Sequence, residues 1–241
     1  MLGIKFDALT MSQLSEIIFD SVRSGSRNII ANHNLHSIYL FHHDLEMRDF
    51  YSKTHIIHVD GMSLVYLARI FGYSVHRVQR VTYIDLIWPL MAESARQNWR
   101  VFYLGGKPGI AEEAAKCLRQ AFPQLELLTH HGYFARTAQE NSHILEMIHD
   151  FKPKILMVGM GMPLQEHWIL KNLDQIDAAV ILPTGACFDY IAGVVHSPPR
   201  WMGKVGLEWL FRLASEPQRL WKRYLLEPWY IFGLILKELL Q

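Results

Sequence analysis

Asp60 stands at a junction where chemistry is expected. The apolar run from His55 to Val59 ends just before it, Gly61 follows it, and a helical pattern begins at Ser63. Aspartate is favoured as the cap of a helix N-terminus, where it is stabilised as an anion and loses basicity. It is equally suited to act as a general base at the carboxyl end of a strand, where open α/β sheets bind their ligands. The sequence leaves both roles open for this carboxylate.

Arg80 is the cation that we pair with Asp60 as a catalytic candidate. A guanidinium binds diphosphate oxygens through parallel hydrogen bonds, although an arginine at this place can also be simply solvated. No Asp-x-Asp occurs anywhere in the chain, so a carboxylate pair that holds a divalent metal on a diphosphate is not evident. We therefore expect the charge of any bound diphosphate to be met by backbone N–H groups, Arg or Lys.

Two glycine-rich stretches follow apolar runs and are interpreted as substrate-binding. Gly105 and Gly106 open the turn GGKPG, whose N–H groups could hold a phosphate; a plain strand-to-helix turn is the alternative. The stretch GMGMPLQE follows Val158. Its last two residues, Gln165 and Glu166, start the next helix and either bind polar groups of a ligand or cap that helix.

Several well-known motifs are missing from the sequence. It has no G-x-G-x-x-G and no Walker A loop, which argues against a standard dinucleotide oxidoreductase and a kinase-like NTPase. It has no G-x-S-x-G elbow of an α/β-hydrolase. The 13 histidines include no zinc-binding spacing with His or Cys, so we interpret them as surface or satisfied core histidines. We predict neither a metal site nor a cofactor.

The elements that have to position these residues alternate between strands and helices. Several strand candidates are short apolar runs without alternation, which is typical of a parallel sheet covered on both faces. Strands that alternate with helices imply right-handed βαβ units. The predicted strands are 28–31, 55–59, 100–104, 125–129, 155–158 and 179–182, and the clearest helical patterns are 35–41, 63–71 and 110–122. The sequence therefore predicts an α/β fold with a Rossmann-like parallel sheet, and the polar strand ends meet at one edge of it.

Composition limits the partners. The net charge of the 241 residues is +1, so no overall field selects nucleic acid or another polyanion. The two cysteines are far apart in the sequence, which favours a reducing compartment over a disulfide framework. We see no signal-peptide pattern at the N-terminus.

The character of the chain changes after residue 197, and we predict a core of residues 1–197 with a helical appendage of residues 198–241. The stretch 200–241 holds seven Lys and Arg residues against four Glu, and four of the seven tryptophans. Its longest apolar run, from Trp229 to Leu236, is eight residues long, whereas a membrane span needs roughly 20. The appendage is either a lid packed on the core or an element that binds a membrane surface or a partner.

Taken together, the motifs resemble those of the family 26 glycosyltransferases. This family includes N-acetylmannosaminyltransferases of teichoic-acid linkage units, N-acetylmannosaminuronic acid transferases of enterobacterial common antigen, and capsule and exopolysaccharide relatives. The blocks follow one another in order from about residue 28 to about residue 224. The matching residues are Asn32-x-Asn34; Val59-Asp60-Gly61; Arg80-Val81-x-x-x-Asp85; Phe102-x-Leu104-Gly105-Gly106; Gly159-x-Gly161-x-Pro163-x-Gln165-Glu166; Gly185-x-x-Phe188-Asp189 with Ala192-Gly193; and Pro199-x-Trp201 through Gly206-Leu207-Glu208-Trp209-x-x-Arg212-Leu213-x-x-Glu216-Pro217-x-Arg219.

The resemblance implies a role for each matching site residue. Asp60 would be the base and Arg80 would steady the leaving diphosphate. The implied substrate-binding residues are Asn34 and Gln165 near the sugar, Asp189 near the nucleotide, Arg212, Arg219 and Arg223 near the diphosphates, and Asn32, Gly105, Gly106 and Glu166 beside them.

The resemblance also implies the reaction. A sugar would pass from a UDP-sugar to a polyprenyl-diphosphate-linked saccharide, with inversion and without a required metal, in the synthesis of a bacterial surface polysaccharide. The enzyme would sit peripherally on the cytoplasmic face of the inner membrane. The sequence departs from the family at Asn32, Tyr83 and Ser197, so the donor, N-acetylmannosamine-type or glucose-type, stays open. The alternative function left open is that of a non-catalytic nucleotide-sugar-binding or scaffold protein of a polysaccharide assembly complex. A homo-oligomer is possible in either case.

Overall fold

One parallel sheet forms the centre of the molecule. The computed structural model describes residues 1–196 and 198–240. Its sheet has six strands in the order β2-β1-β6-β5-β3-β4, and each of the described strand pairings is parallel. The strands are β1 (Asn28–His33), β2 (Ile56–Val59), β3 (Val101–Gly105), β4 (Leu127–His130), β5 (Ile155–Gly159) and β6 (Val180–Pro183). The predicted α/β fold is confirmed, and the predicted strands differ from these mainly at their ends.

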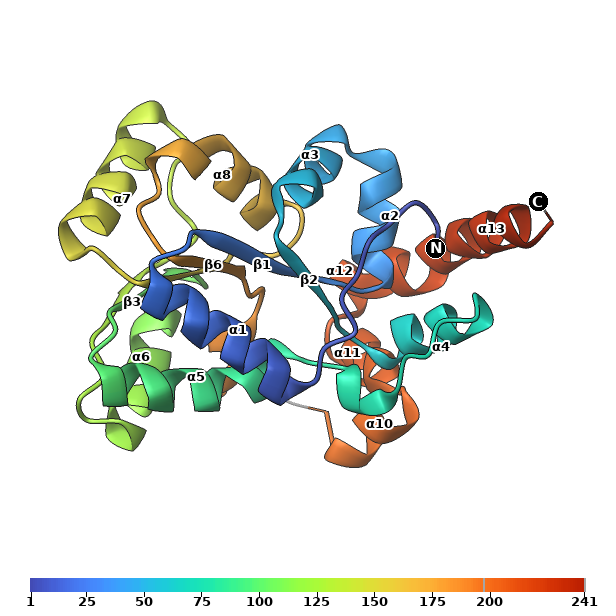
Figure 1. Cartoon of the computed structure of the whole chain (residues 1–241), viewed down its shortest axis with the longest axis horizontal. Coiled ribbons are helices and arrows are strands. Elements are labelled where there is room, and N and C mark those ends of the chain that lie inside the picture. Colours follow the sequence, from blue (N-terminus) through green and yellow to red (C-terminus); the bar gives the residue numbers. More distant parts are fainter. Residues whose placement is uncertain (197, 241) are drawn as a thin grey trace.

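Helices cover both faces of the sheet (Figure 1). On one face lie α1 (Met11–Ser24), α5 (Tyr83–Gln97), α6 (Ile110–Ala121) and α9 (Cys187–Ile191). On the other face lie α2 (Leu35–His43), α3 (Leu45–Lys53), α7 (Ala138–Phe151) and α8 (Leu164–Asn172). The remaining helices are α4 (Met62–Ile70), α10 (Arg200–Val205), α11 (Glu208–Ser215), α12 (Pro217–Trp221) and α13 (Glu227–Leu239), with short turns at Arg77–Gln79, Leu173–Gln175 and Lys222–Leu226.

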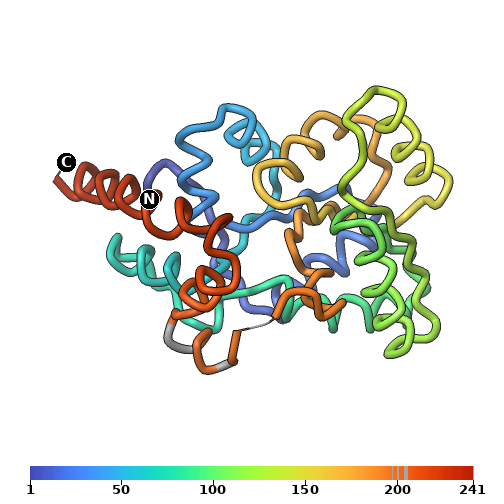
Figure 2. The backbone as a smooth tube through the Cα atoms, turned by 180° about the vertical axis from the view of Figure 1, so that it is seen from behind, coloured from blue at the N-terminus to red at the C-terminus, as the bar shows by residue number. Residues whose placement is uncertain are grey.

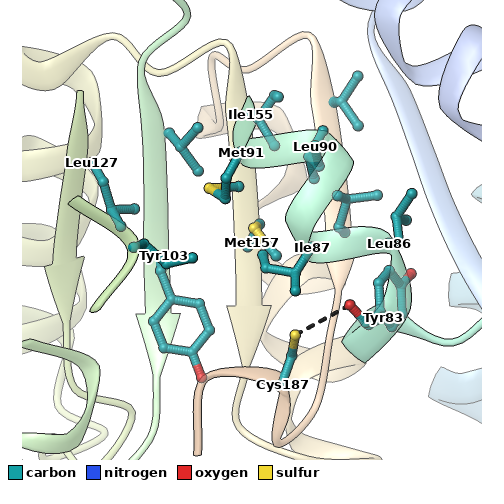
Figure 3. Packing of buried hydrophobic residues seen from close by; sticks show 14 of the residues in the cluster. Tyr83, Leu86, Ile87, Leu90, Met91, Tyr103, Leu127, Ile155, Met157 and Cys187 are labelled. Atoms are coloured by element: carbon teal, nitrogen blue, oxygen red, sulfur yellow. Dashed lines mark hydrogen bonds between the residues drawn. The ribbon is translucent and has the colours of Figure 1, made fainter. Parts of the chain in front are cut away.

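Local sequence explains why these helices form where they do. Thr10 and Gln13 make a capping box at the start of α1. In α6, Ala111, Ala115 and Leu118 are fully buried, because they recur at the spacing of one helical face. The side chains of α5 pack on the sheet beside Met157 of β5, and Cys187 Sγ donates to the Tyr83 carbonyl at 3.4 Å (Figure 3). Helices α1, α3, α5 and α7 were not predicted, although the buried residues Leu14, Ile18 and Val22 of α1 recur at the spacing of one helical face.

The strand order makes a topological switch point at the carboxyl ends of β3 and β5, where a binding crevice is expected. The connection from β3 runs outward to β4, whereas the connection from β5 runs back toward β6. The loops that follow these two adjacent strands therefore diverge, which is the arrangement at which open α/β sheets bind ligands. The glycine-rich stretches after β3 and β5 lie at this point.

The C-terminal helix α13 packs beside α2 and α4, on the side of the sheet where β2 is the edge strand. Figures 1 and 2 show α13 beside α2 and the N-terminal segment. Ile231 is buried in one cluster with Val65 and Leu67 of α4, and the Leu2 N–H donates to Glu238 Oε2 at 2.7 Å. The predicted boundary at residue 197 coincides with a position outside the described residues, so the division into core and appendage stays a prediction. No helix of the described residues is both long and apolar enough to cross a bilayer.

Candidate active site

Asp60 lies just beyond the end of β2, and its side chain faces β1. The N-cap of α4 is Gly61, with φ of +89° and no side-chain hydrogen bond to the helix. The helix-cap interpretation of Asp60 is therefore wrong. The turn at Gly61 directs the carboxylate across the sheet edge, where Asn32 Nδ2 donates to Asp60 Oδ2 at 3.2 Å.

The surroundings of Asp60 favour a base that is stronger than an ordinary aspartate. Burial is the largest influence and raises the pKa of its carboxyl. The charges of Arg212, Arg80 and Arg223 and the amide of Asn34 lower this pKa, but they only partly offset the burial. The loss of basicity expected for a helix-capping aspartate does not occur, because the carboxylate is not the cap.

Arg80 is held between the core and the C-terminal helices. The Val81 N–H donates to the Val59 carbonyl at 2.9 Å, which places the preceding arginine beside the end of β2. Arg80 Nη1 donates to Glu208 Oε2 of α11 at 2.9 Å, and the Arg80 side chain is only 14% exposed. The alternative of a simply solvated arginine is therefore wrong.

Two of the three predicted arginines of the C-terminal helices reach Asp60. Arg212 and Arg223 are half-buried, and their positive charges act on its carboxyl. The Arg212 guanidinium lies 5.6 Å from the centre of the Tyr190 ring, and its Nε has no hydrogen-bond partner among the described residues. The base predicted from the core thus lies beside cations from both parts of the chain.

The charge of Arg219 acts on Asp189, and Arg219 is not among the arginines that act on Asp60. It is exposed and forms an ion pair with Glu216. Its charge lowers the pKa of the Asp189 carboxyl, as does that of Lys107, while burial raises this pKa by more. Asp189 and Lys107 therefore mark a second polar region, next to the crevice between β3 and β5.

The last residues of β3 and β5, Gly105 and Gly159, leave room for the side chain of Tyr103. A Cβ on Gly105 would lie 2.6 Å from Tyr103 Oη, and one on Gly159 would lie 2.2 Å from it. The Gly106 N–H donates to the Gly159 carbonyl at 3.2 Å. This one N–H of the loop is therefore already used within the fold, while phosphate binding by the other N–H groups of the loop stays a prediction. That Gly105 and Gly106 border the substrate stays a prediction.

Gln165 and Glu166 tie loops together beneath the surface, where both are fully buried. Gln165 Oε1 accepts from the N–H groups of Gly161 and Gly185, at 3.1 Å each. Gln165 Nε2 donates to Glu166 Oε1 at 2.8 Å, while Glu166 Oε2 has no partner among the described residues. Burial raises the pKa of Glu166 to about 7. The pair joins the loops after β5 and β6, and its predicted contact with a polar ligand stays a prediction.

Asn34 caps α2, and Asn32 is buried behind Asp60. Asn34 Oδ1 accepts from the Ser37 N–H at 3.1 Å, so its oxygen is used and its amide group remains near the carboxylate. Asn32 is 3% exposed and its Nδ2 holds Asp60. The structure thus brings both asparagines to the catalytic candidate.

His33 and His58, at the ends of β1 and β2, are buried polar residues that were not predicted as part of the site. His58 is fully buried, and neither ring nitrogen has a hydrogen-bond partner among the described residues. Burial lowers the pKa of His58 to about 4 and that of His33 to about 3. Tyr83, where the family often has glycine, packs edge-on against His58 at 5.2 Å between ring centres. The sequence position of His58 could have predicted its place near Asp60, because His58 precedes Asp60 by two residues and residues two apart on a strand share a face.

Tyr103 and Glu208 were also missed. The Tyr103 ring stacks on Phe188 with 3.6 Å between ring centres, and its buried Oη has no partner among the described residues. Nothing in the local sequence of Glu208 distinguishes it from a solvated glutamate. Within residues 1–196 and 198–240, no group of three or more His, Cys, Asp or Glu side chains is placed to hold a metal ion.

Comparison with known proteins agrees with this arrangement. Two relatives come from Staphylococcus aureus, strains MW2 and NCTC 8325, and both are named N-acetylglucosaminyldiphosphoundecaprenol N-acetyl-beta-D-mannosaminyltransferase. Each is 27% identical to this chain over 232 residues, which cover 92% of this chain and 85% of the relative. The model of the WecG/TagA/CpsF glycosyl transferase family matches residues 1–241. The resemblance inferred from the motifs is confirmed: the chain belongs to the WecG/TagA/CpsF family of glycosyl transferases and is a glycosyltransferase.

Proposed function

We propose that this glycosyltransferase moves a sugar from a UDP-sugar to a polyprenyl-diphosphate-linked saccharide, with inversion at the anomeric carbon. The observation that carries the proposal is one partly buried carboxylate, Asp60, which feels the charges of Arg80 of the core and of Arg212 and Arg223 of the C-terminal helices. The names of the relatives support it, because they describe transfer to a sugar diphosphate of undecaprenol.

Asp60 acts as the general base in this proposal. Its carboxylate takes the proton of the acceptor hydroxyl, whose oxygen attacks the anomeric carbon as the bond from that carbon to the UDP oxygen breaks. One displacement on the opposite face inverts the configuration. The raised pKa of Asp60 suits this role, because a stronger base accepts a proton more readily.

The arginines stabilise negative charge. Charge develops on the departing UDP in the transition state, and fixed cations at that position lower the barrier. Arg80 is the candidate for the leaving group, while Arg212 and Arg223 lie where the diphosphate of the lipid-linked acceptor can approach Asp60. Asp189 and Lys107, at the crevice between β3 and β5, are the candidates for contact with the nucleotide.

The exposed apolar residues of the C-terminal helices support a peripheral position on the cytoplasmic face of the membrane. Trp229 is 73% exposed, Phe232 52% and Leu240 85%. Large apolar side chains in such numbers on amphipathic helices favour burial at a lipid interface. A membrane-bound enzyme would meet its polyprenyl acceptor in the plane where that acceptor resides.

The decisive experiment replaces the base. Asp60→Asn preserves shape and removes the proton acceptor, so transfer to a polyprenyl-diphosphate acceptor should fall by roughly 10²–10⁴-fold while the affinity for UDP persists. Transfer is followed with radiolabelled UDP-sugars, N-acetylmannosamine-type and glucose-type, with and without EDTA. Unchanged transfer by the variant would remove Asp60 from the mechanism. Transfer that stops in EDTA would contradict the expectation that the reaction requires no metal.

A further inference from the structure

Glu208 interacts with two arginines, one in each part of the chain, whose charges act on Asp60. Its Oε2 accepts from Arg80 Nη1 at 2.9 Å, and its negative charge also acts on Arg212, one helical turn further along α11. The Glu208 side chain is 31% exposed, so water screens this charge only in part. The carboxylate therefore serves as a shared counter-ion for one cation of the core and one of the C-terminal helices.

Gly203 of α10 fixes the position of this carboxylate. A Cβ on Gly203 would lie 2.6 Å from Glu208 Oε1 and 3.4 Å from Arg80 Nη1. The absence of a side chain at this position lets α10 close over the ion pair. Glu208 is thus confined by backbone on one side and by Arg80 on the other, unlike the exposed pair of Glu216 and Arg219.

The hydrogen-bond geometry leaves Arg80 able to act on a substrate. A guanidinium has five N–H donors in a rigid plane, and only Nη1 donates to Glu208. Holding one corner of the plane fixes the orientation of the other donors. Without the carboxylate, Arg80 and Arg212 would repel each other, and the long side chain of Arg80 would regain its rotational freedom.

We propose that Glu208 is a positioning residue, which holds Arg80 in the orientation that receives the diphosphate of the donor and thereby makes catalysis depend on docked C-terminal helices. This inference rests on the proposed function of Arg80. It gives the C-terminal helices a task beyond membrane contact and beyond supplying their own arginines, since a carboxylate on α11 orders a cation of the core.

The test compares Glu208→Gln with Glu208→Asp in the full-length protein. Glu208→Gln keeps the shape but removes the charge, and we expect the affinity for UDP to fall roughly tenfold, which corresponds to about 1.4 kcal/mol. The affinity for uridine, which lacks the diphosphate, should stay unchanged, and kcat should fall more than KM rises. Glu208→Asp keeps the charge and should restore a large part of both losses. Calorimetry gives the affinities and the labelled-sugar assay gives the rates.

The control is Glu238→Gln, which alters another contact between the C-terminal helices and the core, the hydrogen bond from the Leu2 N–H. This variant should bind UDP like the wild type, and binding of Glu208→Gln to lipid vesicles should equal that of the wild type. Equal losses in Glu208→Gln and Glu238→Gln would overturn the inference, because helix docking in general would then explain both. Unchanged or tighter UDP binding by Glu208→Gln would overturn it too. If the wild type itself neither bound UDP nor transferred sugar, the proposed function would fail instead.

Discussion

At the residue scale, the behaviour of Asp60 depends on a balance between burial and three arginines. Burial raises its pKa, and Arg212 from α11, Arg80 from the core and Arg223 from the segment before α13 pull it down. Because the base works in its deprotonated form, activity is present above this pKa and is lost as the pH falls through it. The arginines therefore set how far the enzyme tolerates acid.

This balance predicts the effect of Arg212→Gln on the pH profile. Arg212 makes the largest opposing contribution at Asp60, so its removal raises the pKa further and the acidic limb of kcat/KM should move to higher pH. Arg212→Lys keeps a positive charge and should shift the limb less. Steady-state rates between pH 4 and 9 give the midpoints. Identical limbs in the wild type and Arg212→Gln would mean that another group controls the profile.

Glu166 makes a second prediction, on stability. Its pKa is raised from 4.5 to about 7 in the folded protein, so the folded state favours the protonated form. The stabilisation by this group is complete below pH 4.5 and is lost as the pH rises through about 7. In Glu166→Gln nothing titrates at this position, so the free energy of unfolding of the variant should fall less between pH 4.5 and 7 than that of the wild type, by roughly 3 kcal/mol. Urea unfolding at several pH values measures the difference between the two proteins. Parallel curves would contradict the assignment.

At the element scale, the carboxyl edge of the sheet depends on strand ends that lack side chains. Gly105 of β3 and Gly159 of β5 are register partners, and the Tyr103 hydroxyl fills the space that their side chains would take. Thr184 continues this packing, since its N–H donates to the Val158 carbonyl at 2.7 Å. The crevice between β3 and β5 therefore has a floor of fixed backbone and one aromatic ring.

Gly159→Ala should consequently destabilise the protein strongly. Its Cβ would lie 2.2 Å from Tyr103 Oη and 2.5 Å from the Gly185 carbonyl oxygen. The carbonyl oxygen belongs to the backbone and cannot move without displacing the chain. We expect a loss of roughly 2–3 kcal/mol, the cost of overpacking a core. Gly233→Ala in α13 is the matched control, because nothing lies within 4 Å of its added Cβ, and it should stabilise the helix by up to about 1 kcal/mol. Chemical denaturation measures the free energy of unfolding of both variants. Equal changes in this free energy would refute the packing argument.

At the scale of the whole molecule, the C-terminal helices are joined to the core by polar contacts as well as by apolar ones. His36 Nδ1 of α2 lies 2.7 Å from Glu227 Oε2 of α13, and Ile231 is buried against α4. The opposite side of α13 leaves Trp229 and Phe232 exposed. The same helix can therefore pack on the core with one face and meet a lipid surface with the other.

From the exposed apolar face of α13 we predict how the protein binds lipid vesicles. The double variant Trp229→Ser/Phe232→Ser removes exposed apolar area and leaves the packed face of α13 unchanged. Each Å² of apolar area that is withdrawn from lipid contact costs about 25 cal/mol. The affinity for anionic vesicles, measured by sedimentation, should therefore fall by roughly tenfold or more. The melting temperature should stay close to that of the wild type. Deletion of residues 198–241 should abolish both vesicle binding and transfer, since it also removes Arg212 and Arg223. Undiminished vesicle binding by the double variant would exclude this face of α13 as the anchor.

The sequence by itself determined the parallel sheet and the position of Asp60 at its edge. Short apolar runs between helical patterns specify buried parallel strands, and polar residues at strand ends must then gather on one side. These features depend on residues adjacent in the chain, so local pattern was enough. The same holds for α6, whose alanines mark the buried face.

Tertiary structure alone decided which groups touch. Asp60 caps no helix, because Gly61 is the N-cap of α4 and turns the chain. Gln165 accepts hydrogen bonds from two glycine loops that are 24 residues apart. Arg80 donates to a glutamate 128 residues away. The pKa of Asp60 follows from burial and from cations of distant segments, which no local spacing encodes. Local sequence fixes strands and turns through backbone preferences, whereas charge, burial and partner depend on the packing of segments that are remote in the chain.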